Sequence, residues 1–517
     1  MSHNAFPDTE IASDLMADFD AAVRDWPDLP AIMHNGSTVT YRELAERVSV
    51  TASRYRARGI GADKACGRVG VLVTRTPALA EQLLGILQAG GSYCPIDAGL
   101  PVARQQALAA ALDLDRLFST APDQYEPMNP WRETFDEDPA AEQTTLPQSS
   151  WCPSDPAYVL CTSGSTGAPK PVVVSRQALT VTVRALRDLF ELTPNDRVLQ
   201  FASLGWDTCF EEILPTLTAG AALVFDDAAH SHLFPRFVRM LAEQHVTVLN
   251  LPTAFWHEFV HFLHGENALL PATLRLVVIG GERVDPTRLR QWRDLDVGHI
   301  RLLNTYGCTE TTMVTHAVQL SGPGTEREVL AHITEVPMGR PLPHVRDHIT
   351  EHGELLVSGP SLATGYLGLP ELTAIGFPVA DHGSGRTRWF RTGDLVTLGE
   401  QGLLYSLGRV DDQVKVLGVR VHPAEVEAQL NAHPAVAGAV VVGERHVGRT
   451  VLTAYVALAG STTPAELKAF LRDRLPSQFV PSRIKFVPAL AYAPNGKVDR
   501  AGTRRAVADY DSRGISR

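Results

Sequence analysis

Short apolar runs alternate with helical patterns along most of this 517-residue chain. Helix-like stretches, such as 77–89 and 234–244, lie between or beside runs that resemble strands. The strand-like runs occupy residues 69–73, 172–174, 222–225, 246–249 and 276–279. This alternation is typical of an α/β fold in which β-sheets are flanked by helices.

The chain is too long for a single hydrophobic core. After residue 353 it changes to short strands and tight turns, and a helix is expected to start near Pro423. We expect a large N-terminal domain over residues 1–407 and a small α+β domain over 408–517. The polar stretch 126–154 is expected to form an exposed connector.

Charge and cysteine usage disfavour several classes of protein. The net charge of −11 argues against a nucleic-acid or membrane-surface binder, which would be basic. The six cysteines are scattered without a CxxC pair, as is typical of a reducing compartment. There is no apolar signal core at the start and no run of transmembrane length. We expect a cytoplasmic protein, a monomer or weak dimer, with no nucleic-acid or membrane partner.

The stretch 162–170, TSGSTGAPK, follows an apolar run and combines two glycines with hydroxyl side chains and a final lysine. Backbone amides, hydroxyls and an ammonium group placed together can cradle a polyphosphate. The order differs from a Walker A loop, which ends in Gly-Lys-Ser/Thr, and from a nucleophile elbow, which needs glycine where Ser163 stands. On composition alone, a flexible surface loop is an equal alternative.

Four further strings follow this loop in a fixed order. They are NTYGCTE at 304–310, FRTGDL at 390–395, GRVDDQVK at 408–415 and NGKVDR at 495–500. Together with the loop they resemble adenylation domains of the nonribosomal peptide synthetase type, in the superfamily of acyl-CoA synthetases and luciferase. The resemblance runs from about residue 37 to 501. It departs from the family pattern at Pro171, Cys308 and Val421-His422, none of which removes a catalytic group.

The resemblance implies a reaction that joins a carboxylate to the α-phosphate of ATP and expels pyrophosphate, with Mg²⁺ as a cofactor. Tyr306 would lie against the adenine, Asp394 would accept the ribose hydroxyls, and Arg409 would assist on the ribose or phosphate side. The β- and γ-phosphates would be held by Thr162, Ser163, Gly164, Ser165, Thr166, Gly167 and Lys170.

The same resemblance implies the catalytic groups. Thr309 and Glu310 would contact the α-phosphate and Mg²⁺, a cation that prefers oxygen ligands. Lys497 would bridge the substrate carboxylate and the α-phosphate. Because Lys497 belongs to the small domain, that domain must fold over the large one, and Asp411 matches the hinge position.

The string GWDTCFEE at 205–212 indicates which kind of acid the protein activates. Asp207 matches the aspartate that binds the substrate ammonium in amino-acid-activating members, although a helix N-cap is its alternative role. Glu211 lies one helical turn further, on the same face. Two carboxylates in an apolar pocket repel unless a cation compensates them. The other pocket positions carried over from the family are Thr208, Asn250, Val278, Gly280, Thr305, Met313 and Val314.

This set of residues resembles pockets for ornithine or lysine, and it predicts a basic or diamino acid as the substrate. The small Gly280 would leave the pocket deep enough for a long side chain. A β-amino acid is the rival substrate. No segment after Arg500 resembles a carrier domain, so we expect a free-standing enzyme of secondary-metabolite biosynthesis, such as antibiotic biosynthesis. It would pass its aminoacyl group to the phosphopantetheine arm of a separate carrier protein. Transfer to coenzyme A and a non-catalytic nucleotide-binding homologue remain alternatives.

Overall fold

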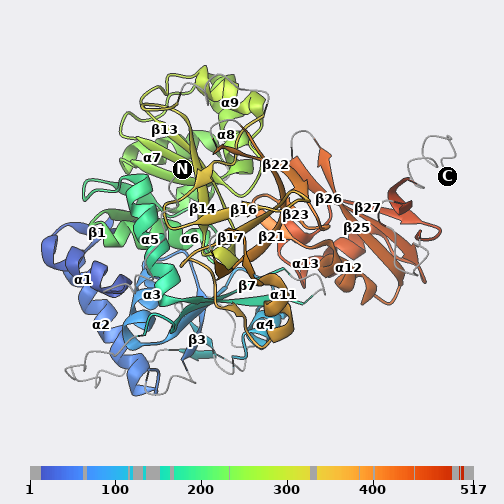
Figure 1. Ribbon diagram of the computed structural model, residues 1–517, viewed down its shortest axis with the longest axis horizontal. Coiled ribbons are helices and arrows are strands. Elements are labelled where there is room, and N and C mark those ends of the chain that lie inside the picture. The colour runs from blue at the N-terminus through green and yellow to red at the C-terminus, as the bar shows by residue number, and fades with distance from the viewer. Residues whose placement is uncertain are drawn as a thin grey trace. The chain divides into compact units, whose positions relative to one another are not determined.

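We describe the protein from a computed structural model (Figure 1). The structure describes residues 13–61, 67–114, 117–119, 132–134, 152–163, 168–231, 233–326, 335–383, 385–399, 402–446, 449–491, 500 and 502–505. The chain divides into two compact units. The described residues of Met1–Ala98, Leu112–Leu160 and Pro171–Val410 form the first unit, and those of Gly99–Ala111, Cys161–Lys170 and Asp411–Arg517 form the second.

A nine-stranded sheet lies in the first unit. Its strands are β1 (Pro30–His34), β2 (Ser37–Thr40), β9 (Arg197–Leu199), β10 (Ala222–Phe225), β11 (Val248–Pro252), β12 (Leu276–Gly280), β13 (Arg301–Gly307), β14 (Val314–Ser321) and β15 (Arg340–Pro341). Their order is β15-β14-β13-β12-β11-β9-β10-β1-β2. The pairs from β1 through β13 are parallel, whereas β2, β14 and β15 pair antiparallel at the two edges.

A seven-stranded sheet has the order β18-β8-β7-β4-β3-β5-β6. Its strands are β3 (Arg68–Val73), β4 (Ser92–Asp97), β5 (Leu117–Ser119), β6 (Arg132–Thr134), β7 (Pro156–Thr162), β8 (Lys170–Ser175) and β18 (Gly365–Tyr366). The β3–β4, β3–β5, β4–β7 and β5–β6 pairs are parallel, and β18 pairs antiparallel with β8.

The helices of the first unit differ in burial. They are α1 (Leu15–Asp25), α2 (Tyr41–Ala57), α3 (Ala78–Ala89), α5 (Arg176–Phe190), α6 (Thr208–Thr218), α7 (Phe234–Glu243), α8 (Thr253–Glu266), α9 (Pro286–Arg293) and α11 (Pro370–Gly376), with 3₁₀ turns η2 (Asp227–His230) and η3 (Thr309–Thr311). Helix α6 is buried almost all round, whereas no residue of α11 is buried. Local sequence explains several boundaries: Thr40 and Glu43 form a capping box at the start of α2, and Gly90 adopts φ 88° after α3.

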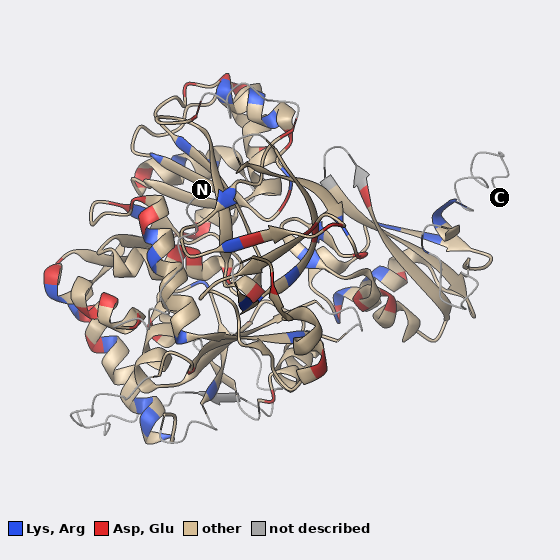
Figure 2. Cartoon of the chain, in the orientation of Figure 1, with Lys and Arg blue, Asp and Glu red and all other residues tan. Residues whose placement is uncertain are grey.

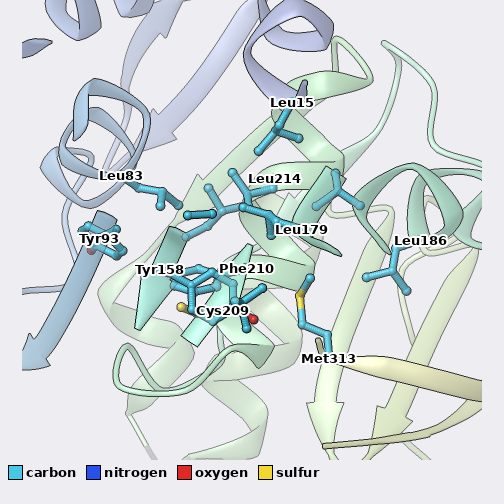
Figure 3. Close-up of a cluster of buried hydrophobic side chains, with 14 of the residues drawn as sticks. Leu15, Leu83, Tyr93, Tyr158, Leu179, Leu186, Cys209, Phe210, Leu214 and Met313 are labelled. Carbon is cyan, nitrogen blue, oxygen red and sulfur yellow. The ribbon is translucent and has the colours of Figure 1, made fainter. Parts of the chain in front are cut away.

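The main hydrophobic core joins both large sheets. One buried cluster contains side chains of β3, β4, β7 and β8 from one sheet, of β11, β12 and β13 from the other, and of α1, α3, α5 and α6. Figure 3 shows Tyr158 of β7 beside Cys209 and Phe210 of α6, and the Tyr158 and Phe210 rings meet at 4.9 Å between centroids. Helix α6 is therefore anchored in the core directly beyond its first residue.

The first unit also contains a four-stranded antiparallel sheet and a hairpin. The sheet has the order β16 (Arg346–Ile349), β17 (Glu354–Ser358), β21 (Phe390–Leu398) and β22 (Leu404–Arg409), and the hairpin comprises β19 (Val379–Asp381) and β20 (Arg386–Arg388). The second unit contains α4 (Val102–Ala111), β23 (Val414–Val416), β24 (Val419–Val421), α12 (Pro423–Asn431), β25 (Val436–His446), β26 (Arg449–Leu458), α13 (Pro464–Arg472), η5 (Ser477–Phe479) and β27 (Arg483–Val487).

The structure confirms the predicted α/β class, and the predicted helix near Pro423 is α12. The stretch expected as a connector lies mostly outside the described residues, but it contains β6, which its polar composition did not indicate. The last boundary between the units falls between Val410 and Asp411, and the second unit also includes Gly99–Ala111 and Cys161–Lys170. Lysine and arginine are interspersed with acidic residues over the helices of the first unit (Figure 2). Among the described helices, none is long and apolar enough to cross a membrane.

Candidate active site

A buried network fixes the loop that leads into helix α6. The Glu212 carboxylate accepts hydrogen bonds from the amides of Phe201 and Ala202 and from the Gln200 side chain. Arg75 donates to the carbonyls of Phe201 and Ala202 at 3.1 and 2.9 Å. Arg75 thus binds the carbonyls of the loop before α6, and Glu212 binds its amides, so both kinds of backbone group are fixed. Sequence reasoning missed Arg75 and Glu212, because their partners lie far away along the chain or are main-chain groups.

Asp207 occupies the N-cap position of α6, but its side chain makes no capping hydrogen bond. It is 7% exposed, and its Oδ2 atom is buried without a hydrogen-bond partner among the described residues. Burial raises the pKa of this carboxyl to about 6, with the Glu310 charge adding to the rise and a hydrogen bond from Thr309 opposing it. The alternative role of Asp207 as a helix cap is thus not realised.

Glu211 lies one turn along α6, as the sequence predicted, and it is 7% exposed. Its Oε2 atom accepts a hydrogen bond from Asn250 Nδ2 of β11 at 3.0 Å. Burial raises the pKa of the Glu211 carboxyl to about 8, the Asn250 hydrogen bond lowers it, and the Asp207 charge raises it further. Two acidic groups therefore share an environment that disfavours their ionised forms.

The remaining pocket positions belong to α6 and to neighbouring strands of the nine-stranded sheet. Thr208 is the first residue of α6, Val278 and Gly280 lie on β12, Thr305 lies on β13, and Met313 directly precedes Val314, the first residue of β14. All of these positions lie in the first unit.

Gly280, which was expected to leave depth in the pocket, lies against the neighbouring strand β13. It pairs with Thr305 across β12 and β13. A Cβ atom at Gly280 would lie 2.7 Å from Thr305 Oγ1 and 3.2 Å from the Thr305 carbonyl oxygen. The Thr305 hydroxyl is held there because it donates to the Ile279 carbonyl at 3.1 Å. The glycine therefore makes room for Thr305, and the sequence could not show this contact between strands.

The expected nucleotide residues form one ionic cluster. The Tyr306 hydroxyl donates to Asp394 Oδ2 at 2.6 Å, and Arg409 donates to Asp394 Oδ1 at 2.7 Å. The side chains of Arg409 and Asp394 are 13% and 10% exposed, so this is no surface ion pair. Burial and the Asp394 charge raise the pKa of Tyr306 well above its usual value, which keeps the phenol as a donor.

Glu310 lies in η3 and is 1% exposed. Its Oε1 atom accepts a hydrogen bond from the Tyr366 hydroxyl at 3.1 Å, a contact that sequence reasoning did not anticipate. Thr309 precedes it in η3 and is close enough to bond Asp207. Within the described ranges, no group of three or more His, Cys, Asp or Glu side chains could hold a metal ion alone.

The expected phosphate loop and lid residues are described only in part. Thr162 ends β7 and Lys170 begins β8, and the Thr162 hydroxyl donates to the Lys170 carbonyl at 3.4 Å. Ser163 is described, whereas Gly164, Ser165, Thr166, Gly167 and Lys497 lie outside the described residues. Asp411 is the first residue of the long segment of the second unit.

The structure thus brings the expected residues together in three groups within the first unit. Asp207 is hydrogen-bonded to Thr309 and lies within reach of the Glu310 charge, Glu211 is bonded to Asn250, and Asp394 is bonded to Tyr306 and Arg409. A carboxylate beside a turn that carries a second carboxylate can bind a cationic group. A carboxylate fixed between a phenol and a guanidinium can accept hydroxyl donors, since each oxygen has two lone pairs.

Two family models match the chain. Residues 19–367 match the family model described as AMP-binding enzyme, and residues 425–497 match that of the AMP-binding enzyme C-terminal domain. The chain is 38% identical over 488 residues to the isonitrile lipopeptide synthase of Streptomyces coeruleorubidus, covering 91% of this chain and 32% of that protein. It spans a third or less of the length of the curated relatives that it matches.

Solved structures show the same fold. An artificially fused adenylation-PCP di-domain protein, NpsA-ThdA from Klebsiella oxytoca, is similar with a TM-score of 0.78 and 24% identity, covering 92% of this chain and 93% of that one. The amide bond synthetase McbA from Marinactinospora thermotolerans is similar with a TM-score of 0.76 and 25% identity, covering 94% and 99%. The chain therefore belongs to the AMP-binding enzyme family.

Proposed function

We propose that this protein activates an amino acid as its aminoacyl-AMP and releases pyrophosphate. The observation that carries the proposal is Asp207, a buried carboxylate that leaves Oδ2 without a partner among the described residues and does not cap its helix. An isolated buried charge is costly, and a substrate ammonium would compensate it. Acids without an amino group would leave that cost in place.

The substrate class follows from Glu211. A substrate with a neutral aliphatic side chain would leave the Glu211 carboxyl protonated near neutral pH, because burial raises the pKa of this carboxyl to about 8. A second amino group or a cationic side chain would stabilise the carboxylate and share it with Asn250, which already donates to Oε2. A basic or diamino acid of the ornithine or lysine type is therefore the favoured substrate.

The nucleotide and metal are assigned to the other residues of the site. Tyr306 would lie against the adenine, and Asp394, fixed by Tyr306 and Arg409, would accept the ribose hydroxyls. Glu310 fits Mg²⁺, because this ion is usually held by one or two carboxylates together with substrate phosphates and needs no cage of protein ligands. Bound there, Mg²⁺ would offset negative charge on the phosphates. Thr309 would orient the α-phosphate, and residues 162–170 would hold the β- and γ-phosphates.

The acceptor of the aminoacyl group is proposed to be the phosphopantetheine thiol of a carrier protein. Adenylation-PCP proteins are among the similar solved structures, which supports this acceptor. The similarity to an amide bond synthetase makes an amine acceptor the competing outcome. Incubating the enzyme, ATP and lysine with a phosphopantetheinylated carrier protein, coenzyme A or a free amine separates these acceptors by mass spectrometry of the products.

The substrate proposal is tested by ATP–pyrophosphate exchange over a panel of acids. The panel contains lysine, ornithine, a β-amino acid, leucine and a fatty acid, each with wild type, Asp207→Asn and Glu211→Gln. Glu371→Gln is the matched control, because Glu371 is an exposed residue of α11. Cationic amino acids should support the fastest exchange, and Glu211→Gln should remove that preference. A wild-type preference for leucine would contradict the cationic pocket, and exchange with the fatty acid alone would contradict amino acid activation.

The role of Lys497 is tested by separating the two half-reactions. Lys497→Ala should abolish formation of aminoacyl-AMP and leave transfer from preformed aminoacyl-AMP intact. Equal loss of both half-reactions would contradict a role restricted to adenylation.

A further inference from the structure

We propose that Tyr366 is a positioning residue for Glu310, and that its hydroxyl orients this carboxylate toward the divalent cation that accompanies ATP. The inference rests on the proposed role of Glu310 in holding that cation. Tyr366 itself would touch neither the cation nor the substrates.

The contact is direct and buried. The Tyr366 hydroxyl donates to Glu310 Oε1 at 3.1 Å, and the two residues are 9% and 1% exposed. A hydrogen bond to a buried carboxylate is stronger than one between neutral groups, and it restricts the rotation of the carboxylate. Without the phenol, Glu310 would keep its place in η3 but lose a constraint at its tip.

The backbone around Glu310 is tied to the same short segment. The Ala363 amide donates to the Glu310 carbonyl at 2.9 Å, and the Thr312 hydroxyl donates to the Ser361 carbonyl at 2.7 Å. Hydrogen bonds thus join residues 309–312 to residues 361–366 at both the backbone and the side chains, and the Tyr366 contact reaches the Glu310 carboxylate itself.

The backbone and the ring of Tyr366 are both held in place by neighbouring residues. Its backbone pairs with Val172 in the β18–β8 ladder, and its amide donates to the Thr373 hydroxyl at 2.9 Å. Its ring packs edge-on against Phe377 at 5.7 Å between centroids. Both the main chain and the ring are therefore held before the hydroxyl reaches Glu310.

Strand β8, which pairs with the strand that carries Tyr366, follows directly after the proposed phosphate loop in the chain. Strand β8 begins at Lys170, the end of the proposed phosphate loop, and Val172 lies two residues further along. The strand that carries the end of the phosphate loop thus also carries the pairing partner of Tyr366. The backbone pairing of Tyr366 with Val172 therefore fixes the position from which the hydroxyl reaches the Glu310 carboxylate.

Tyr366→Phe tests the proposal, because it removes the hydroxyl and keeps the ring. Tyr455→Phe is the matched control: the Tyr455 hydroxyl donates to Glu444 Oε1 at the same 3.1 Å, Tyr455 is 3% exposed, and both residues lie in the second unit. The probe is Mn²⁺, titrated in the presence of ATP and followed by electron paramagnetic resonance. The same proteins are assayed for the Mg²⁺ concentration that half-saturates pyrophosphate exchange and for Tm.

Tyr366→Phe should weaken Mn²⁺ binding in the ATP complex by about 5- to 10-fold and raise the half-saturating Mg²⁺ concentration similarly, as expected for a lost hydrogen bond to a charged group. The KM for the amino acid should stay unchanged, and Tyr455→Phe should leave Mn²⁺ binding unchanged. In a Glu310→Gln background, Tyr366→Phe should add nothing further. Unchanged Mn²⁺ affinity in Tyr366→Phe, or additive losses in the double variant, would overturn the positioning role.

Failure of the Tyr366 inference can be distinguished from failure of the proposed function. If wild type binds Mn²⁺ with ATP but exchanges pyrophosphate with no amino acid, the substrate proposal fails and the Tyr366 measurement still stands. If Glu310→Gln binds Mn²⁺–ATP as wild type does, the assigned role of Glu310 fails and the inference fails with it.

Discussion

The two sides of the proposed site treat equally buried carboxylates in different ways. Asp394, Asp207 and Glu211 are each 7% exposed. Asp394 has a guanidinium on one oxygen and a phenol on the other, whereas the donors to Asp207 and Glu211 are neutral. They include the Thr309 hydroxyl and the Met313 amide for Asp207, and the Asn250 side chain for Glu211. The nucleotide side is therefore compensated before any ligand binds. On the acid side, burial disfavours the ionised carboxylates, and we propose that a cationic group of the substrate offsets this desolvation cost.

The strongest test of this contrast is Asp207→Asn. Removing the carboxylate should lower kcat/KM for the amino acid by about 100-fold or more, because a buried charge-assisted partner of the substrate ammonium is lost. The KM for ATP should hardly change. Pyrophosphate exchange at varied amino acid and ATP concentrations measures both, and an equal loss for both ligands would erase the distinction between the two sides.

Asp394→Asn is the reciprocal change. It should raise the KM for ATP by roughly 10- to 30-fold, because it weakens acceptance of the ribose hydroxyls and leaves Arg409 without its ionic partner. The KM for the amino acid should stay near the wild-type value. A nucleotide-binding titration without amino acid checks this directly, and unchanged affinity would remove Asp394 from the nucleotide side.

Glu211→Gln separates the role of Glu211 from that of Asp207 on the acid side of the site. It should reduce the preference for lysine over leucine by about tenfold, since an amide cannot compensate a cation. It should also raise the Tm of the substrate-free protein by a few degrees. A carboxyl whose folded-state pKa is raised contributes stability that is lost as pH rises, so this gain should grow from about pH 4.5 to pH 8. A Tm gain that is constant with pH would contradict the raised pKa.

The pH dependence of KM gives the smallest effect. Because the pKa of Asp207 is about 6, KM for a neutral amino acid should fall roughly twofold between pH 6 and pH 7.5 and then level off. Because the pKa of Glu211 is about 8, KM for lysine should keep falling up to about pH 8. Identical profiles for the two substrates would show that Glu211 does not face the substrate side chain.

The sequence predicted those parts of the molecule that depend on local pattern. The apolar run 222–225 is strand β10, and the four-residue spacing places Asp207 at the N-cap of α6 and Glu211 in its first turn. The ordered strings assigned Tyr306 and Asp394 to the same nucleotide by resemblance, and in the structure the Tyr306 hydroxyl donates to Asp394 Oδ2 at 2.6 Å. Strand and helix periodicity carries this kind of information because it is set by neighbours in the chain.

The contacts that give the site its character could not be predicted in this way. The bond between Tyr366 and Glu310 joins residues 56 positions apart in the sequence. The clamp of Arg75 on the loop before α6 joins residues 126 and 127 positions apart. Such contacts depend on which strands become neighbours in the sheets, and the composition of either segment does not specify the other.

The close approach of Gly280 and Thr305 has a consequence for redesign of the pocket. Because a Cβ atom at position 280 would lie 2.7 Å from Thr305 Oγ1, the two positions share one volume. Libraries that vary them independently would contain mostly clashing pairs. Productive variants with a side chain at 280 should carry a smaller residue at 305, so the two positions are best randomised as a single coupled unit in which one gains the volume that the other gives up.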